Sequence, residues 1–369
     1  LIAKHKSPSQ IYSQKLMDDK IIDEEYFLKL VTDYRDKLDD DYDNAKKVEK
    51  TTINLFLESD WINFKKAKSE DLKLDIVTKV KMKDLVKIAD AITTLPAEKN
   101  ILRKTVKLIN ERKEMFSNGT AIDWGLAEML AYGTLLHEGH NVRISGQDVQ
   151  RGTFSHRHAI IKSDDSEEEI ILLNNVSKKN NTTFSIYNSP LSEYAVLGFD
   201  YGFAMASPNT LTVWEAQFGD FSNGAQIIID QYISAAEDKW KLPNGIVLFL
   251  PHGYEGQGAE HSSARMERFL QLCADDNMIL ANCTSPSNFF HLLRKQIKSS
   301  YRKPLVVFTP KSLLRHPMVT SNLKDFTEGK FKRVISDDTK EISKIKTLVL
   351  CSGKFYFDIL TERDKIKRE

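Results

Sequence analysis

The stretch NSPLSEYAVLGFDYGFA, residues Asn188–Ala204, joins a helix start to a run of small and apolar residues. Pro190 and Ser192 are typical of the residues that begin a helix. Glu193 follows them, and we expect its carboxylate in the first turn of a mostly buried, glycine-spaced helix. Taken alone, this position has a simple explanation, because an acidic side chain interacts favourably with the positive end of the helix dipole.

Strand-like runs on both sides of this helix alternate with helical segments. We expect strands at Val142–Ser145, Thr210–Glu215, Ile246–Leu250, Met278–Ala281 and Leu305–Phe308, with a further short strand at Ile170–Leu173. We expect helices at Ala121–Gly133, Ala225–Ile233, Arg265–Leu272 and Pro286–Lys298. The run Ile246–Leu250 has no polar member, which is typical of a strand covered on both faces. The alternation predicts an α/β fold with a doubly wound, mostly parallel sheet.

The segments before and after this region differ in character. Residues 1–117 are rich in lysine and aspartate, and we expect helices around Ile21–Val31, through Asp39–Lys66 and at Ile101–Met115, with a short strand at Ile76–Val80. The acidic run Asp39–Asp43 predicts a solvated face, because its spacing matches no calcium-binding loop. In residues 318–369, a strand at Thr347–Gly353 predicts the start of another α/β domain. The predicted parts are therefore 1–117, 118–317 and 318–369.

Composition limits the classes of function. The chain has 369 residues and a formal net charge of +1, which argues against a nucleic-acid-binding surface as its main function. Its three cysteines are far apart and indicate a reducing compartment without disulfides. No apolar run approaches the roughly twenty residues that a membrane span needs. The chain begins with Leu1, so we expect a fragment or a processed chain.

Three loops follow predicted strands and hold most of the reactive side chains. The loops are Gly146–His158, Trp214–Asn223 and His252–Ser263. Carboxyl ends of parallel strands meet at one edge of a sheet, so we expect these loops to converge near Glu193. They carry the rings of Phe218 and Phe221 and the histidines His156, His158, His252 and His261. Ordinary salt-bridged loops and plain turn glycines remain alternative explanations.

Several common catalytic motifs are absent from the sequence. It contains no GxxxxGK[ST], no GxGxxG after a strand and no HExxH. P-loop kinases, Rossmann dehydrogenases and zinc proteases of that type therefore have no motif support.

Longer runs of sequence resemble a known family. They are SGQDVQRGTFSHRH from Ser145, the NSPLSEYAVLGFDYGFAMASPN run from Asn188, LTVWEAQFGDFSNGAQIIIDQ from Leu211 and LPHGYEGQGAEHSSARMERFLQL from Leu250. These runs resemble the thiamine-diphosphate-dependent decarboxylase component of 2-oxoglutarate dehydrogenase complexes, densely over about residues 121–320. The resemblance implies a transketolase-like fold, in which residues 118–317 are the pyrimidine-binding domain. It also implies a helical connector before this domain and the start of a C-terminal α/β domain after it.

The resemblance also implies roles for single residues. Glu193 matches the glutamate that contacts the ring nitrogen of the cofactor's aminopyrimidine and so promotes formation of the thiazolium ylid. Phe221 is similar to the aromatic residue that stacks on the pyrimidine, and Gln217 and Asp148 complete the expected cofactor-binding set. His261 is similar to an active-site histidine near the substrate and the acyl transfer, and His252 is a second catalytic candidate. His156 and His158 are substrate-binding candidates, and no metal ligand is expected in this chain.

The activity implied by the family is oxidative decarboxylation of 2-oxoglutarate in the citric acid cycle, with transfer of the succinyl group to a lipoyl group. Implied partners are a second copy in a homodimer, the lipoyl domain of the dihydrolipoyl succinyltransferase component and, through the complex, dihydrolipoyl dehydrogenase. No nucleic acid and no membrane are expected as partners. The expected compartment is the bacterial cytoplasm, with the mitochondrial matrix as the alternative. Two other functions stay open: a 2-oxoadipate dehydrogenase, and a non-catalytic fragment that acts only as an assembly module.

One departure from the family pattern concerns the other end of the cofactor. The family binds diphosphate and Mg²⁺ through a GDG motif, and no GDG occurs in this sequence. Its active site forms between subunits, with the pyrimidine and diphosphate ends held by different chains. We therefore expect this chain to supply the pyrimidine half of a site and to be inactive alone.

Overall fold

The computed structural model describes residues 4–49, 57–166, 168–176, 181–336, 343 and 345–366. The chain divides into two compact units, Leu1–Glu58 and Ser59–Glu369. The smaller unit contains helices α1 (Pro8–Asp18) and α2 (Glu24–Ala45).

The helices expected in the smaller unit are placed differently in the structure. Ile21 and Ile22 lie in the turn between α1 and α2, because Asp23 accepts a hydrogen bond from the Tyr26 N–H and starts a new helix. The helix expected around Ile21–Val31 is therefore confirmed from Glu24 onward, without Ile21 and Ile22. The helix expected through Asp39–Lys66 is confirmed as a continuous helix only for Asp39–Ala45, since α2 ends at Ala45. Residues 50–56 of that expectation lie outside the described residues.

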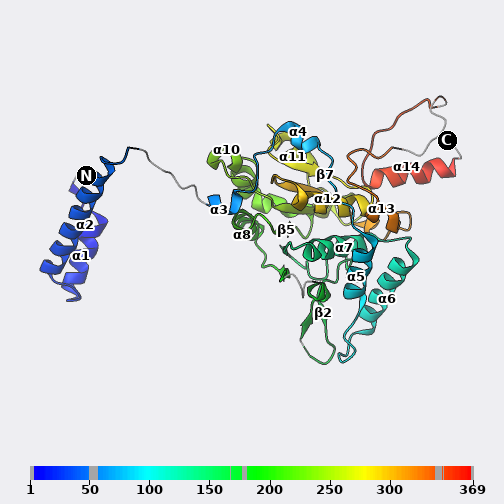
Figure 1. The fold of residues 1–369 in the computed structure, drawn as a ribbon, viewed down its shortest axis with the longest axis horizontal. Coiled ribbons are helices and arrows are strands. Elements are labelled where there is room, and N and C mark those ends of the chain that lie inside the picture. Colours follow the sequence, from blue (N-terminus) through cyan, green and yellow to red (C-terminus); the bar gives the residue numbers. More distant parts are fainter. Residues whose placement is uncertain are drawn as a thin grey trace. The chain divides into compact units, whose positions relative to one another are not determined.

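A six-stranded parallel sheet organises the larger unit (Figure 1). Its strands are β1 (Val142–Gly146), β4 (Phe184–Asn188), β5 (Leu211–Glu215), β6 (Val247–Pro251), β7 (Ile279–Ala281) and β8 (Leu305–Thr309). They lie in the order β4-β1-β5-β6-β8-β7, and every pairing within this sheet is parallel. The five strands expected around β1 and β5–β8 are confirmed. The edge strand β4 was not expected. A separate antiparallel pair consists of β2 (Ile161–Lys162) and β3 (Glu169–Ile170).

Helices cover both faces of this sheet. Along β6, Val247 and Phe249 join a core with α5 (Met82–Thr93), α7 (Trp124–His137) and α12 (Pro286–Lys298). Leu248 and Leu250 join a second core with α8 (Glu193–Ala206), α9 (Gln226–Ile228) and α11 (Met266–Leu272). Successive side chains of a strand point to opposite faces, so this all-apolar strand serves two cores.

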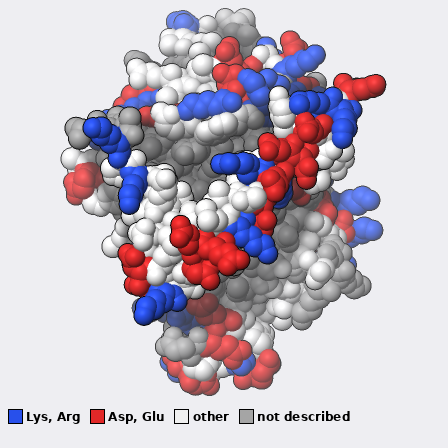
Figure 2. Space-filling model, turned by 90° about the vertical axis from the view of Figure 1, so that its left-hand side faces the viewer, with Lys and Arg blue, Asp and Glu red and all other residues white. Residues whose placement is uncertain are grey.

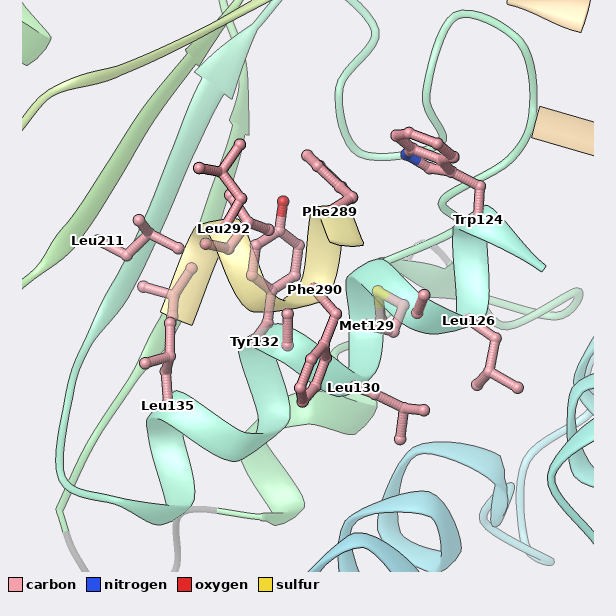
Figure 3. Close-up of a cluster of buried hydrophobic side chains, with 14 of the residues drawn as sticks. Trp124, Leu126, Met129, Leu130, Tyr132, Leu135, Leu211, Phe289, Phe290 and Leu292 are labelled. Carbon is pink, nitrogen blue, oxygen red and sulfur yellow. The ribbon is translucent and has the colours of Figure 1, made fainter. Parts of the chain in front are cut away.

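The contact between α7 and α12 forms the centre of the first core (Figure 3). Helix α7 is apolar on all sides and buried from Trp124 to Leu136. The Trp124 and Phe289 rings stack with their centroids 4.9 Å apart, and Tyr132 meets Phe184 of β4 at 5.7 Å. An all-round apolar helix is stable only when neighbours surround it, which fits α7 between the sheet, α5 and α12.

Shorter elements connect these layers. The remaining helices are α3 (Glu58–Trp61), α4 (Ser69–Lys73), α6 (Arg103–Asn118), α10 (Ala236–Trp240), α13 (Leu323–Thr327) and α14 (Lys354–Lys365). The 3₁₀ helices are η2 (Leu172–Asn175), η3 (Gly219–Ala225), η5 (Ala259–His261) and η6 (Ser312–Arg315), and η4 (Ile229–Ile233) is a π-helix. The helix expected at Ala225–Ile233 is present but changes pitch from α9 to η4.

Three expected strands are wrong, wholly or in part. The segment Ile76–Val80 is extended, but its backbone bonds to helices: Arg294 of α12 donates to the Thr78 carbonyl, and Val80 N–H donates to the Phe326 carbonyl. Of the strand expected at Ile170–Leu173, only Ile170 lies in a strand, which is β3. The 3₁₀ helix η2 begins two residues later, at Leu172. The described residues of Thr347–Gly353 form no strand, and Leu348 and Leu350 are 80% and 85% exposed.

The sequence predicts a domain boundary at residue 118. The larger unit of the structure begins well before that residue. Leu85 and Ile88 of α5 are buried in the same core as α7. The functional boundaries drawn from the resemblance stay predictions. Among the described residues, every helix is too short or too polar to span a lipid bilayer. Acidic and basic side chains are interspersed on the face shown in Figure 2.

Candidate active site

The strand order places a topological switch point at the carboxyl ends of β1 and β5, and the crevice expected at such a point is the candidate site. The chain passes from β1 to β4 on one side and then returns to β5 on the other side of β1. Loops that leave such a switch point diverge, and ligands of open α/β sheets bind there. Gly146 pairs with Glu215 at this edge. Its φ is +149°, and an added Cβ would lie 2.1 Å from the Glu215 carbonyl oxygen, so only glycine fits.

Glu193 lies at this crevice, as the first residue of α8. Ser192 is the N-cap, and its hydroxyl accepts a hydrogen bond from the Ala195 N–H. The Gln147 side-chain amide donates to Glu193 Oε1 at 2.8 Å. An added Cβ on Gly224 would lie 3.2 Å from Glu193 Oε2. The carboxylate is therefore held between the loop after β1 and η3, and its predicted place in the first helical turn is confirmed.

Helix α8 is more exposed than the sequence indicates. Its buried residues are Leu197, Asp200, Tyr201 and Ala204. Tyr194 and Phe199 are 50% and 63% exposed, and Leu191 just before the helix is 86% exposed. The expectation of a mostly buried helix is wrong, because only one side of α8 packs on the second core. The exposed apolar side chains lie beside Glu193 in the sequence.

Aromatic rings from the three predicted loops contact one another beside η3, the element that approaches Glu193. The rings of Phe218 and His261 have centroids 4.4 Å apart, and Phe221 lies 5.4 Å from His261. Phe154 meets Phe218 edge-on at 5.6 Å. The expected convergence of the loops after β1, β5 and β6 is thus confirmed. Phe221 belongs to η3, the element that also brings Gly224 against Glu193.

Two buried charged residues hold the glycine-rich loop after β6. Lys311 is 3% exposed, and its Nζ donates to Gln257 Oε1 at 2.8 Å and to the His261 carbonyl at 2.6 Å. Burial lowers the pKa of Lys311. Asp220 Oδ1 accepts from the backbone N–H groups of Ser262 and Ser263. Neither residue was predicted, although Lys311 directly follows the predicted strand Leu305–Phe308 and its short turn.

His252 is held as a neutral ring with a defined proton. Its Nδ1 accepts a hydrogen bond from the Ala264 N–H at 3.0 Å, so the proton of the neutral ring is on Nε2. Burial lowers the pKa of His252, and the charge of Lys311 lowers it further. His261 differs, because its Nδ1 lies 3.0 Å from the exposed carboxylate of Glu260.

A buried ion-pair network supports the loop after β1 from inside. Arg157 Nε donates to Glu128 Oε1 at 2.6 Å and its Nη1 donates to Glu215 Oε1 at 3.0 Å. Burial alone raises the pKa of Glu128, but Arg157 and His156 outweigh it and lower the pKa to about 2. His156 Nε2 lies 3.6 Å from Glu128 Oε2, and its side chain is 8% exposed. His156 therefore faces this network, and its proposed role toward substrate stays a prediction.

The remaining predicted residues occupy the rim of the loops. Asp148 has a left-handed backbone with φ +55°, and its carboxylate pairs with Arg151. His158 is half-buried, and burial together with the charge of Arg112 lowers its pKa. Gln217 is half-buried next to Phe218. Their roles stay predictions. Within the described residues, no three His, Cys, Asp or Glu side chains are placed to hold a metal ion.

Comparison with protein families identifies the fold that carries this crevice. Residues 120–317 match the model for the transketolase pyrimidine-binding domain. The chain belongs to the transketolase pyrimidine-binding domain family. This membership confirms the predicted transketolase-like α/β fold. Residues 320–369 match the model described as 2-oxoglutarate dehydrogenase C-terminal, so the pyrimidine-binding domain is followed by a second matched segment.

Relatives of this chain are similar along almost its whole length. The 2-oxoglutarate dehydrogenase E1 components of Brucella anthropi and Brucella abortus strain S19 are each 42% identical over 375 aligned residues. The alignments take in 99% of this chain and 37% of each relative. The chain therefore spans little more than a third of the length of the curated relatives that it matches. These matches confirm the resemblance described above.

The residues at the switch point fit the pyrimidine end of thiamine diphosphate, the cofactor that the family implies. Glu193 would present a carboxylate to a ring nitrogen. Only a residue without a side chain lets the backbone at position 224 lie this close to the carboxylate, because an added Cβ would be 3.2 Å from Oε2. Phe221 supplies an aromatic ring from the same element, and such rings stack on flat heterocycles.

Proposed function

We propose that this chain is the pyrimidine-binding part of a thiamine-diphosphate-dependent 2-oxoglutarate dehydrogenase. The reaction is oxidative decarboxylation of 2-oxoglutarate with transfer of the succinyl group to a lipoyl group, a step of the citric acid cycle. The observation that carries the proposal is the Glu193 carboxylate, held at the switch point between the Gln147 amide and the Gly224 backbone. The similarity to the 2-oxoglutarate dehydrogenase E1 components of Brucella supports the choice of substrate.

Each residue of the site has a proposed task. When bound, thiamine diphosphate supplies the electron sink for decarboxylation. Glu193 would bond a nitrogen of the pyrimidine ring and hold or release a proton there, and Phe221 would lie against the ring. His261 exchanges protons with the substrate at Nε2, because Glu260 holds its Nδ1. His252 offers the proton on its Nε2.

The proposal requires partners for the other half of the site. A second subunit would supply the diphosphate-binding residues and Mg²⁺, giving a homodimer in the complete enzyme. The exposed Leu191, Tyr194 and Phe199 next to Glu193 support a covering subunit, because such side chains favour burial at interfaces. The lipoyl domain of the succinyltransferase component and dihydrolipoyl dehydrogenase would complete the complex. The bacterial relatives support a location in the bacterial cytoplasm.

Substitution of Glu193 tests the proposal. Glu193→Gln removes the carboxylate but keeps the size, so we expect a loss of about 100-fold or more in kcat for 2-oxoglutarate, with unchanged thermal unfolding. Glu267→Gln is the matched control, because Glu267 is also an acidic residue in the first turn of a helix. If both variants retained near-normal decarboxylation, Glu193 would be no more than a helix-dipole partner.

The same assay separates the alternatives that the sequence leaves open. Faster turnover of 2-oxoadipate than of 2-oxoglutarate would assign the other dicarboxylic oxo acid. A chain that pairs with a diphosphate-binding chain but never yields a Glu193-dependent reaction would be an assembly module.

A further inference from the structure

The hydrogen bond between Gln147 and Glu193 joins two distant parts of the chain. The Gln147 amide Nε2 lies 2.8 Å from Glu193 Oε1, and the contact is partly buried. An amide N–H is a donor that carries no charge, and an ionised carboxylate is its natural acceptor. The bond therefore fixes one oxygen of the Glu193 carboxylate.

The backbone that carries Gln147 is fixed on both sides. Gly146 before it pairs with Glu215 in the sheet, and no other residue fits there. Val149 after it is fully buried in the first core. The Gln147 backbone is thus fixed, and the side chains of Gln147 and Glu193, with three rotatable bonds each, hold one another in place through the hydrogen bond.

The two oxygens of Glu193 consequently have different surroundings. Oε1 accepts the Gln147 hydrogen bond, and Oε2 lies close to the Gly224 backbone, where an added Cβ would be 3.2 Å away. We propose that Gln147 is a positioning residue for Glu193, which holds Oε1 and so fixes the direction in which the carboxylate meets the pyrimidine ring. This inference rests on the proposed function, because it takes the pyrimidine ring as the ligand of Glu193.

The amide is essential to this role, since a second carboxylate at position 147 would act differently. Two carboxylates at 2.8 Å keep their contact only by sharing one proton, so Gln147→Glu would protonate the pair near neutral pH or push it apart. Gln147→Met keeps the length and removes the donor, which frees Glu193 to rotate.

Thermal unfolding of the cofactor-free chain tests the contact without any enzyme assay. Relative to the unsubstituted chain, we expect Gln147→Glu to lower Tm by about 2 °C or more at pH 8 and by less at pH 5, where the pair holds a proton. The double variant Gln147→Glu with Glu193→Gln restores an amide–carboxylate pair with exchanged roles, so it should recover most of the loss at pH 8. No recovery in the double variant would overturn the contact.

Kinetics test the positioning role, in whichever preparation decarboxylates 2-oxoglutarate, alone or mixed with a diphosphate-binding chain. We expect Gln147→Met to lower kcat about tenfold with KM changed less than about twofold, and Gln147→Glu to move the pH–kcat profile. The matched control is Gln226→Glu, because Gln226 donates to Asp230 at 2.7 Å in the same way but outside the site. The Gln226→Glu variant should lose thermal stability at pH 8 and keep an unchanged pH–kcat profile.

The outcomes separate this inference from the proposed function. If Glu193→Gln abolishes activity while Gln147→Met retains full kcat, Gln147 has no positioning role and the proposed function stands. If Glu193→Gln is itself active, the proposed function fails, and with it the positioning role of Gln147. The exchanged double variant should be stable and inactive, and an active one would contradict both.

Discussion

At the scale of single residues, Arg157 stabilises the candidate active site most directly. It is 1% exposed and bonds Glu128 on α7 and Glu215 on β5. Arg157→Met would remove the guanidinium that both buried carboxylates share and would leave only His156 beside Glu128, so we expect a loss of about 3–5 kcal/mol in the free energy of unfolding, measured with urea. Arg151→Met, which removes an exposed pair with Asp148, should cost less than about 1 kcal/mol. Equal effects of the two substitutions would contradict a stabilising role of the buried network.

The same buried groups set the dependence of stability on pH. The pKa of Glu128 is lowered from 4.5 to about 2, so its charged form is favoured by folding. This contribution is fully present above pH 4.5 and is lost as the pH falls toward 2. Urea unfolding at pH 5, 4 and 3 should show the decline, and Arg157→Met should flatten it. A stability that stays level over this range would contradict the paired Glu128.

Buried histidines add a second step at higher pH. Burial lowers the pKa of His291, whose Nδ1 bonds Thr78 and whose Nε2 bonds the Asp325 carbonyl. Folding therefore favours its neutral form, and stability is lost as the pH falls below the ordinary histidine value of 6.5. His291→Gln should reduce the loss in unfolding free energy between pH 7.5 and pH 5.5. An unchanged pH dependence in this variant would show that other groups cause the step.

At the scale of elements, the end of β1 is the point where a small change should do most harm. Gly146→Ala forces a side chain into a backbone with φ +149° and against the Glu215 carbonyl. We expect a loss of about 2 kcal/mol or more in stability and a displaced Gln147 loop. Gly202→Ala in α8 is the control, since nothing lies within 4 Å of the added Cβ and alanine favours helix by up to about 1 kcal/mol. Calorimetric unfolding of both variants checks that Gly146→Ala lowers the stability and Gly202→Ala raises it.

The elements also show what the sequence can and cannot predict. Strands β5, β6 and β8 were predictable because each is a short, largely apolar run, which is typical of a strand covered on both faces. The alternation of Ile76–Val80 was a real pattern, but α12 and α13 supply its hydrogen bonds in place of a strand. Edge strand β4 carries Ser185 and the exposed Tyr187, so its apolar signal is weak.

In the candidate site, the predictable residues were those whose type alone suggests chemistry. Glu193 and His261 stand in recognisable runs of sequence. Gln147 and Lys311 were missed, because an amide or a lysine gains a role only from the contact that folding gives it. Gln147 lies 46 residues from Glu193 in the chain, and Lys311 lies 50 residues from His261. No local pattern contains such pairs.

At the scale of the whole molecule, the exposed apolar side chains near Glu193 predict dependence on a partner. We expect the isolated chain to lack decarboxylase activity and to gain it when mixed with a chain that carries the diphosphate-binding domain. Leu191→Lys should reduce this recovery at least about tenfold without changing the chain's own Tm, because Leu191 is 86% exposed. Leu102→Lys, at a 48% exposed leucine before α6, should not. Activity of the isolated chain would contradict this prediction.

The wholly parallel sheet also governs the rate at which the protein forms. Val142 of β1 pairs with Phe184 and with Leu211. Each edge of β1 therefore pairs only after a segment distant in the sequence has reached it. Chains dominated by such non-local pairings fold slowly, because loop closure must precede the stabilising contacts. The crevice arises only when β1, α8 and β5 have all docked. Ligand binding therefore reports the completion of folding, and a ligand gives no help to a chain that is still partly folded.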